Sequence, residues 1–215
     1  EVLFDDIWLG KQPRSGAKPN AEALEDDELR ATIAVDASKV LRKIPDTLYG
    51  TNIEWVWDGN GLWDADAGRL DKNAVELARR LGVTNLRYPG GIFADFYDWR
   101  KAVGGTGARP SSPHMPGASS SVHNFGTDEV VQLAENLDAS LLITVNIVSG
   151  NEQQAVEWLE YIDDRPGNNR AVFWEVGNEN YNAGPVPYLE QSTLDPTEYA
   201  ARYSRFSHAL KSADS

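Results

Sequence analysis

An acidic and an amide side chain stand next to each other near the C-terminus, directly after a run of apolar residues. The segment reads Ala171-Val-Phe-Trp-Glu-Val-Gly-Asn178-Glu179. Its β-branched and aromatic residues predict a buried strand that ends at Glu179. A carboxylic acid in this position can donate a proton to a leaving oxygen, while the neighbouring amide hydrogen-bonds a sugar hydroxyl. These residue types therefore suit the cleavage of a glycosidic bond.

Composition narrows the classes of partner. The 215 residues carry a formal net charge of −13 and include seven tryptophans. The negative charge argues against nucleic acid and anionic membranes as partners, whereas Trp and Tyr faces can stack on neutral sugars. The sequence has no cysteine, and its three histidines show no spacing typical of metal ligands. We expect no metal site, and the proposed chemistry requires no cofactor.

Four strand-then-helix units are predicted to follow one another after about residue 47. Strands are expected at residues 48–54, 83–88 and 141–146 and in the segment ending at Glu179. Each expected helix has a capping residue, an apolar stripe at helical spacing, or both. The capping residues are Asp71, Asn151 and Asp195, and the stripes are Ala74, Leu77, Ala78 and Leu81; Val130, Leu133, Ala134 and Leu137; and Ala155, Trp158, Leu159 and Ile162. Repeated βα units imply parallel strands with right-handed crossovers, so the predicted fold is α/β, a partial TIM (β/α)8 barrel of about four units.

Six short motifs occur in order along this part of the chain: Leu48-Tyr-Gly-Thr-Asn-Ile-Glu54, Leu86-Arg-Tyr-Pro-Gly-Gly91, Tyr97-Asp-Trp99, Asn124-Phe-Gly-Thr-Asp-Glu129, Thr144-Val-Asn146 and Trp174-Glu-Val-Gly-Asn-Glu179. With these motifs the chain resembles the N-terminal half of the catalytic domain of glycoside hydrolase family 51, the α-L-arabinofuranosidases of clan A. The matching stretches run from about Thr32 to the C-terminus.

The resemblance implies a role for each matching position. Glu179 would be the general acid/base, and Asn178 would bind the sugar 2-hydroxyl. Glu54 would hydrogen-bond arabinose in the −1 subsite, and Arg87 would help to orient the nucleophile. Three further residues would line the pocket: Asn146, Trp99 and Tyr181.

Two features depart from the family pattern. Members commonly carry Asn directly after the Pro-Gly-Gly turn, where this chain has Ile92. The family nucleophile is a Glu on the seventh strand, which would lie beyond Ser215. We therefore expect the chain to be a fragment of a retaining glycosidase and to be inactive by itself. Other clan A specificities (xylosidase, glucuronidase or endo-glycanase) and a non-catalytic glycan-binding protein remain alternatives.

The first residues suggest companion domains. The resemblance implies that residues 1–10 end a carbohydrate-binding β-sandwich, that 11–30 form a linker, and that the strand expected within 31–46 belongs to a companion β-sandwich, before the barrel at 47–215. If a carbohydrate-binding module precedes the chain, an extracellular or periplasmic location is expected. Homo-oligomerisation of the parent protein is left open.

Structural alternatives exist for several candidate residues. Glu179 could be an acid satisfied by backbone donors, Glu54 could form an ion pair, and Arg87 could neutralise a carboxylate such as Glu175. Four tryptophans could form a sugar-stacking platform or belong to the core: Trp55, Trp57, Trp63 and Trp99. For Asp95 and Asp98, in the loop after the Pro-Gly-Gly turn, we expect solvated side chains.

Overall fold

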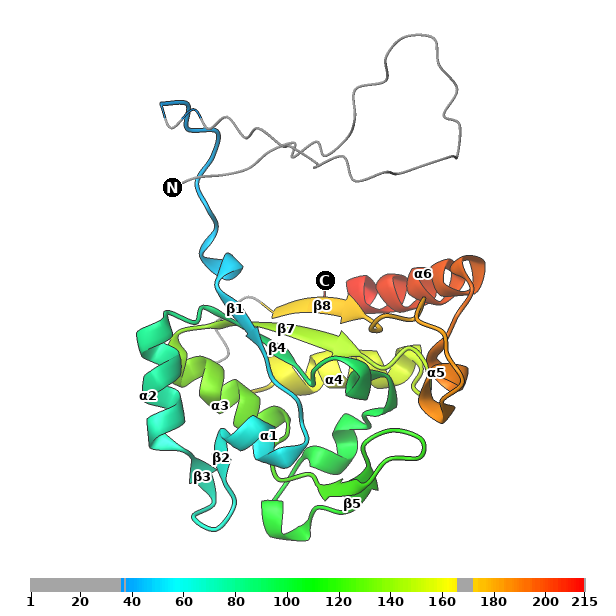
Figure 1. Cartoon of the computed structure of the whole chain (residues 1–215), viewed down its shortest axis with the longest axis horizontal. Helices are drawn as coiled ribbons and strands as arrows, with labels where there is room; N and C mark the ends of the chain where they lie inside the picture. Colours follow the sequence, from blue (N-terminus) through cyan, green and yellow to red (C-terminus); the bar gives the residue numbers. More distant parts are fainter. Residues whose placement is uncertain (1–35, 37, 166–171, 215) are drawn as a thin grey trace, which may run out of the picture. The chain divides into compact units, whose positions relative to one another are not determined.

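The computed structural model of the chain describes residues 36, 38–165 and 172–214 (Figure 1). The chain divides into two compact units, residues 1–45 and 46–215. In the first unit, residues 38–45 form neither helix nor strand. The strands expected at residues 1–10 and 31–35 and the linker at 11–30 lie outside the described residues.

The second unit is built on a parallel sheet of four strands. Its spatial order is β1 (Gly50–Asn52), β4 (Asn85–Tyr88), β7 (Ser140–Val145) and β8 (Val172–Val176). Every neighbouring pair in this sheet is parallel. Because the spatial order follows the order along the chain, each crossover advances the sheet by one strand, as in a (β/α)8 barrel. The predicted α/β fold with a partial barrel is confirmed.

The main helices lie outside this sheet, as Figure 1 shows for α2 (Lys72–Leu81), α3 (Thr127–Leu137) and α4 (Glu152–Asp163) along one face. The long helix α6 (Pro196–Ala213) packs against α4 and β8 and follows the short α5 (Pro187–Ser192). The predicted caps are present, because the side chains of Asp71, Asn151 and Asp195 each accept a backbone N–H of the first helical turn.

The predicted apolar stripes are correct for two helices and wrong for one. All four predicted core residues of α3 and all four of α4 are buried. In α2, by contrast, Leu77 and Leu81 are exposed, and the buried residue is Val75. The helix packs on α3 through the side that carries Val75 and the partly buried Ala78, so the leucines lie on another face.

Three strands are shorter than expected: β4 begins at Asn85 rather than at residue 83, and the first and last strands end early. The first covers Gly50–Asn52, although Ile53 N–H still donates to Arg87 O and Trp55 N–H to Pro89 O. The last strand ends at Val176 rather than at Glu179, because Gly177 turns the chain with a φ of +74°. Both changes place the candidate acidic residues in the loops that follow the strands.

The sheet has an apolar face toward the helices, and its opposite face carries polar side chains together with Leu142 and Phe173. Side chains alternate along a strand, and paired residues of parallel strands point to the same side. Leu86, Leu141 and Ile143 are buried in the core on the helix side. The register puts Asn52 beside Arg87, and Thr144 beside Glu175, on the opposite side.

The segment between β4 and α3 contains several short elements. It includes the 3-10 helices η2 (Ile92–Phe96), η3 (Trp99–Ala102) and η4 (Thr106–Ala108) and the hairpin β5 (Ser111–Pro113) and β6 (Ser120–Val122). A smaller hairpin, β2 (Trp63–Asp64) with β3 (Arg69–Leu70), follows the short turn α1 (Trp57–Gly61), and a 3-10 turn, η1 (Asp46–Leu48), precedes β1. Among the described residues no helix is both long and apolar enough to cross a membrane.

Candidate active site

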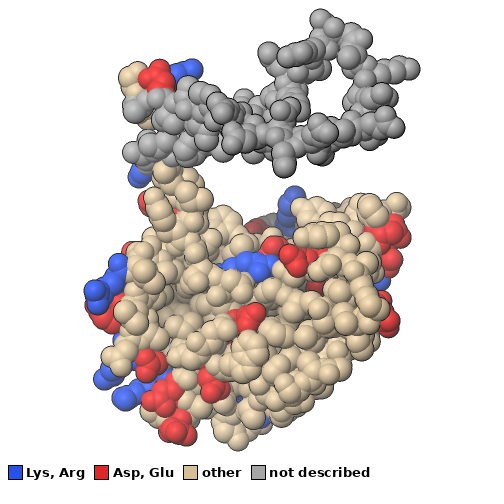
Figure 2. Space-filling view, in the orientation of Figure 1, with Lys and Arg blue, Asp and Glu red and all other residues tan. Residues whose placement is uncertain are grey.

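The candidate residues gather where the four parallel strands end. Glu54 follows β1, Arg87 is the penultimate residue of β4, Asn146 follows β7, and Asn178 and Glu179 follow β8. In (β/α)8 enzymes this C-terminal end of the strands carries the catalytic residues. Figure 2 shows basic and acidic side chains meeting near the middle of the face displayed, surrounded by uncharged residues.

Arg87 connects three segments of this end of the sheet. Its Nε donates to Glu175 Oε2 at 2.6 Å, its Nη1 to Asn52 Oδ1 at 2.8 Å and its Nη2 to Asn178 Oδ1 at 2.9 Å. We call these four residues the strand-end cluster. The guanidinium thereby ties β1, β4 and β8 to the residue that precedes Glu179.

The structure confirms the ion pair between Arg87 and Glu175, which the sequence offers as a structural alternative for Arg87. The same carboxylate oxygen also accepts the hydroxyl of Thr144 at 2.7 Å. Both charged side chains keep part of their surface exposed, 23% for the arginine and 37% for the glutamate. The charge of Arg87 is thus offset within the sheet, while its outer edge stays accessible.

Glu54 is held by a turn that winds in the left-handed sense. Trp57, Asp58 and Asn60 all have φ between +52° and +57°, a conformation that non-glycine residues rarely adopt. The turn brings Asn60 back to Glu54, where its Oδ1 accepts Glu54 N–H at 2.7 Å and its Nδ2 donates to Glu54 Oε2 at 3.2 Å. Among the described contacts Glu54 has no basic partner, so the structure provides no ion pair for it.

Gly90 lies directly against Glu54. A side chain there would place its Cβ 2.5 Å from Glu54 Cγ and 2.9 Å from Ile53 O, and the residue has a φ of +90°. The preceding Tyr88–Pro89 peptide bond is cis. The Pro89-Gly90-Gly91 turn therefore allows the first two strand ends to approach each other closely.

Glu179 has an exposed side chain and an unusual backbone conformation. Its φ is +48°. The one hydrogen bond to its carboxylate in the described part of the chain comes from the hydroxyl of Tyr181 at 3.4 Å, and Tyr181 is itself exposed. No backbone donor reaches this carboxylate among those contacts. The arrangement leaves the acid accessible to a ligand.

Asn146 organises the loop that follows β7. Its Oδ1 accepts the N–H groups of Val148, Ser149 and Gly150, at 3.1, 2.8 and 3.0 Å. Its Nδ2 donates to Ser149 Oγ and to Tyr97 O. These bonds occupy both ends of the Asn146 amide. The described contacts therefore do not support a place for Asn146 in a sugar pocket, and that role stays a prediction.

Trp99 is packed in the core rather than presented at a surface. Its ring stacks on Trp158 with centroids 6.1 Å apart, and its Nε1–H donates to Gln154 O at 2.9 Å. Trp55 and Trp63 are buried too. Trp57, in the turn beside Glu54, has 57% of its surface exposed, so of these four tryptophans it is the one available for stacking on a sugar.

The expectation of a solvated side chain is wrong for Asp95. Its residue is 0% exposed, and burial raises the pKa of its carboxyl to about 7. Asp95 accepts hydrogen bonds from Asn178 and Asn180, which lie in the loop that carries Glu179. Asn180 is a further residue that the sequence does not single out. The signal was the apolar context of Asp95 in Ile92-Phe-Ala-Asp-Phe96. Asp98 is partly exposed, in line with the expected solvated side chain, and it also caps η3 and pairs with Arg100.

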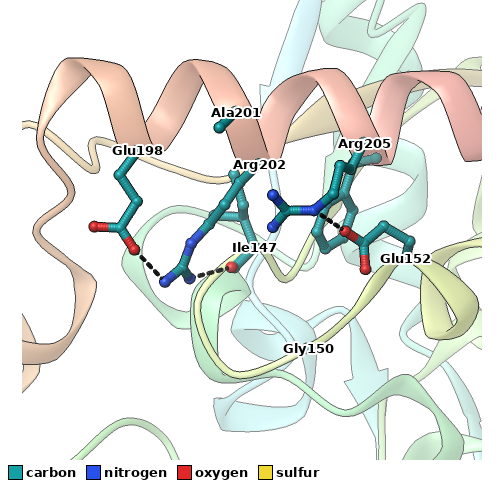
Figure 3. Close-up of a pocket in the computed structure, with 8 residues that line it drawn as sticks. Ile147, Gly150, Glu152, Glu198, Ala201, Arg202 and Arg205 are labelled. Carbon is teal, nitrogen blue, oxygen red and sulfur yellow. Dashed lines mark hydrogen bonds and ion pairs between the residues drawn. The ribbon is translucent and has the colours of Figure 1, made fainter.

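A pocket of about 340 Å³ lies between α4, α6 and the loop after β7 (Figure 3). Its two guanidinium groups are already paired, Arg202 with Glu198 at 2.5 Å and Arg205 with Glu152 at 2.6 Å. None of the candidate catalytic or sugar-binding residues lines it. The pocket is therefore separate from the strand-end cluster.

Known proteins share this arrangement of sequence and fold. The family described as the α-L-arabinofuranosidase 1 domain matches residues 77–215. The chain belongs to this family. The resemblance to glycoside hydrolase family 51 is thereby confirmed.

Relatives of this arabinofuranosidase domain cover most of the chain. A probable α-L-arabinofuranosidase C of Aspergillus clavatus is 30% identical over 206 residues, which is 85% of this chain and 39% of the relative. An intracellular exo-α-(1→5)-L-arabinofuranosidase of Bifidobacterium longum is 25% identical over 207 residues, 86% of this chain and 36% of the relative.

Solved structures agree with the sequence relatives. The thermostable family 51 α-L-arabinofuranosidase of Thermotoga petrophila RKU-1 superposes with a TM-score of 0.71 at 25% identity, covering 82% of this chain and 40% of that structure. The chain thus spans about 40% of the length of the relatives that it matches.

Proposed function

We propose that the protein containing this chain is a retaining α-L-arabinofuranosidase in which Glu179 is the general acid/base. The observation that carries the proposal is the set of hydrogen bonds from Arg87, which fixes Asn178 beside Glu179 at the end of the parallel sheet. The carboxylate of Glu179 itself stays exposed, as an acid that must reach a substrate oxygen requires.

The reaction would proceed by double displacement. A Glu elsewhere in the longer protein attacks the anomeric carbon, and Glu179 donates its proton to the leaving oxygen. Glu179 then takes a proton from the water that hydrolyses the covalent intermediate. For this stereochemistry the two carboxyl groups should lie about 5 to 5.5 Å apart.

Asn178 and Glu54 would bind the sugar. The Oδ1 of Asn178 already accepts from Arg87, so its Nδ2 is the group directed to a substrate hydroxyl. Glu54 accepts from Asn60 through Oε2, and its other oxygen can accept a hydroxyl of the arabinose ring. Tyr181, which donates to Glu179, would contribute to the rim of the pocket.

The test is Glu179→Ala in the full-length protein. Without its acid the enzyme should lose about 10²-fold or more in kcat on natural arabinosides, whose leaving groups need a proton. An aryl arabinoside with an acidic phenol as leaving group should be cleaved in the first step with little loss. Glu190→Ala, at an exposed acid of α5, is the matched control and should leave both substrates unaffected. Normal activity of Glu179→Ala on natural arabinosides would refute the assignment.

A second specificity within clan A is favoured by Ile92. This residue stands where family members commonly have Asn, and it packs against the hydrophobic core instead of offering a polar contact. A panel of aryl arabinosides, xylosides and glucuronides hydrolysed by the full-length protein separates the candidates. A preference for arabinofuranosides supports the main proposal, whereas binding of arabino-oligosaccharides without hydrolysis would indicate a non-catalytic glycan-binding protein.

A further inference from the structure

A buried carboxyl group lies beneath the loop that carries Glu179. Asp95, in η2, accepts the side-chain N–H of Asn180 at 2.9 Å and the backbone N–H of Asn178 at 3.4 Å, both through Oδ2. A single oxygen atom therefore holds the residue before Glu179 and the residue after it. These contacts join positions that are 83 and 85 residues apart along the chain.

The loop needs such support, because its backbone is unusual. Glu179 has a φ of +48°, and a non-glycine residue keeps a positive φ only where its surroundings impose it. The side chain of Asn180 also donates to Ser192 O at 3.1 Å, and the backbone carbonyl of Asn180 accepts Leu194 N–H at 2.8 Å. The loop is thus fixed from η2 on one side and from the end of α5 on the other.

The same 3-10 helix also supports the loop after the neighbouring strand. The carbonyl of Asp95 accepts Ser149 Oγ–H at 3.1 Å, and Asn146 donates to that Ser149 oxygen at 2.8 Å and to Tyr97 O at 3.2 Å. η2 therefore joins the loops after β7 and β8. A displacement of Asp95 would therefore move the loop that carries Glu179.

The protonation of Asp95 fits this position. Asp95 Oδ1 and Asn180 Oδ1 are buried acceptors without a well-formed hydrogen bond in the part of the chain that the structure describes, although the N–H of Ile147 acts to lower the pKa of the Asp95 carboxyl. A proton on the carboxyl would convert Oδ1 into a donor. Burial raises the pKa of this group to about 7, and the negative charge of Glu175 acts in the same direction.

We infer that Asp95 is a positioning residue for Glu179, acting through Asn178 and Asn180 to hold the acid/base in the geometry for proton donation. Asp95 does not touch the substrate, and this role rests on the proposed function of Glu179. Its removal should therefore impair proton donation to the leaving group more than it impairs substrate binding.

The experiment compares Asp95→Ala and Asp95→Asn in the full-length protein on two substrates, a natural arabino-oligosaccharide and a dinitrophenyl arabinoside. We expect Asp95→Ala to lower kcat/KM, which reports the first step, by about 10²-fold on the oligosaccharide and by less than about 5-fold on the dinitrophenyl substrate. Asp95→Asn keeps an oxygen that can accept both hydrogen bonds, so it should restore the oligosaccharide activity to within about 5-fold of the parent protein. Asp98→Ala, three residues further along the chain and partly exposed, is the control and should behave like the parent protein.

The outcomes separate this inference from the proposed function. An equal loss on both substrates, or no loss, would overturn the positioning role if Glu179→Ala still shows the selective loss. If Glu179→Ala shows no selective loss, the proposed function itself fails. Should Asp95→Ala not fold, Asn180→Ala removes the hydrogen bond from the other side, and the same selectivity for the poor leaving group is then required.

Discussion

Two arginine–glutamate pairs in this molecule have the same chemistry and opposite surroundings. Arg109 and Glu129 are 2% and 7% exposed and form two parallel hydrogen bonds, of 2.7 and 2.9 Å. Arg87 and Glu175 in the strand-end cluster are 23% and 37% exposed and share one bond of 2.6 Å. Within the part of the chain that the structure describes, the first pair is closed to solvent and the second is partly open to it.

The remaining hydrogen bonds explain the difference. Arg109 directs its other donors to the backbone carbonyls of Gly104 and His123, and Glu129 accepts Gly126 N–H at the start of α3. We call Arg109, Glu129 and His123 the loop anchor, because they fix the long loop before α3. Arg87 instead directs its donors to the side chains of Asn52 and Asn178, which a ligand can reach. The buried pair joins parts of the scaffold, whereas the open pair arranges the residues of the candidate site.

Breaking the buried pair should produce the largest effect on stability. Glu129→Ala leaves the guanidinium of Arg109 buried without its carboxylate, which typically costs about 3–5 kcal/mol. We expect a correspondingly large fall in the free energy of unfolding of the full-length protein, measured by urea denaturation. Glu76→Ala removes an exposed ion pair on α2 and should change this free energy by less than about 1 kcal/mol. Similar losses in the two variants would show that the loop anchor is dispensable for stability.

Changing the open pair should affect activity more than stability. Arg87→Lys keeps the charge, but one ammonium group cannot reproduce a planar fork that reaches three partners. We expect kcat/KM on an arabinoside to fall by about 10²-fold, because Asn178 and the neighbouring acid lose their alignment. The melting temperature should change by only a few degrees, because the lysine keeps a positive charge beside Glu175.

Arg79→Lys, at an exposed pair on α2, is the control for this substitution. It should leave kcat/KM unchanged. If Arg87→Lys retained full activity and lost as much stability as Glu129→Ala, the contrast between an open functional pair and a closed structural pair would be wrong.

The sequence predicts the local features of both regions well. Caps such as Asp71 and Asn151 act on residues within the same helical turn, so a short segment contains all the information that they require. The apolar stripe of α4 is equally local. The strand before Asn178 was recognisable from its β-branched and aromatic residues, whereas the role that the resemblance implies for Glu179 stays a proposal.

The features that the sequence did not predict depend on distant partners. Asp95 bonds to Asn178 and Asn180, more than 80 residues away, and its apolar neighbours in the sequence indicate burial but not these partners. Trp57 is exposed because the chain forms a left-handed turn that Asn60 stabilises through Glu54. For Leu77 and Leu81 the helical spacing was correct, but the packing of α2 on α3 selected another face.

The two regions also differ in how their buried titratable groups respond to pH. In the loop anchor, burial and the positive charge of Lys101 lower the pKa of His123 from 6.5 to about 4; Asp98 acts against this shift and Arg109 with it. Beneath the loop that carries Glu179, burial and the charge of Glu175 raise the pKa of Asp95 from 3.8 to about 7, and Tyr199 of α6 also faces this group. The shifts have opposite directions, and so should their effects on stability.

The sign follows from which state binds the proton. Between about pH 4 and 6.5 the unfolded protein protonates His123 and the native protein does not, so stability falls as the pH is lowered through this window. Between about pH 4 and 7 native Asp95 keeps a proton that the unfolded chain releases, so stability falls as the pH is raised. Each group contributes at most about 1.4 kcal/mol per pH unit.

His123→Phe and Asp95→Asn each remove one of these groups at similar size. Relative to the parent protein, His123→Phe should gain stability as the pH falls from about 6.5 toward 4, because a ring that cannot be protonated replaces the imidazole stacked on Trp55. Asp95→Asn should gain as the pH rises from about 4 to 7. Urea denaturation of the full-length proteins at intervals across this range, followed by circular dichroism, gives both slopes. If the free energy of unfolding of both variants followed the parent protein in parallel across this pH range, neither group would titrate as its surroundings require. The pH would then not distinguish the two regions.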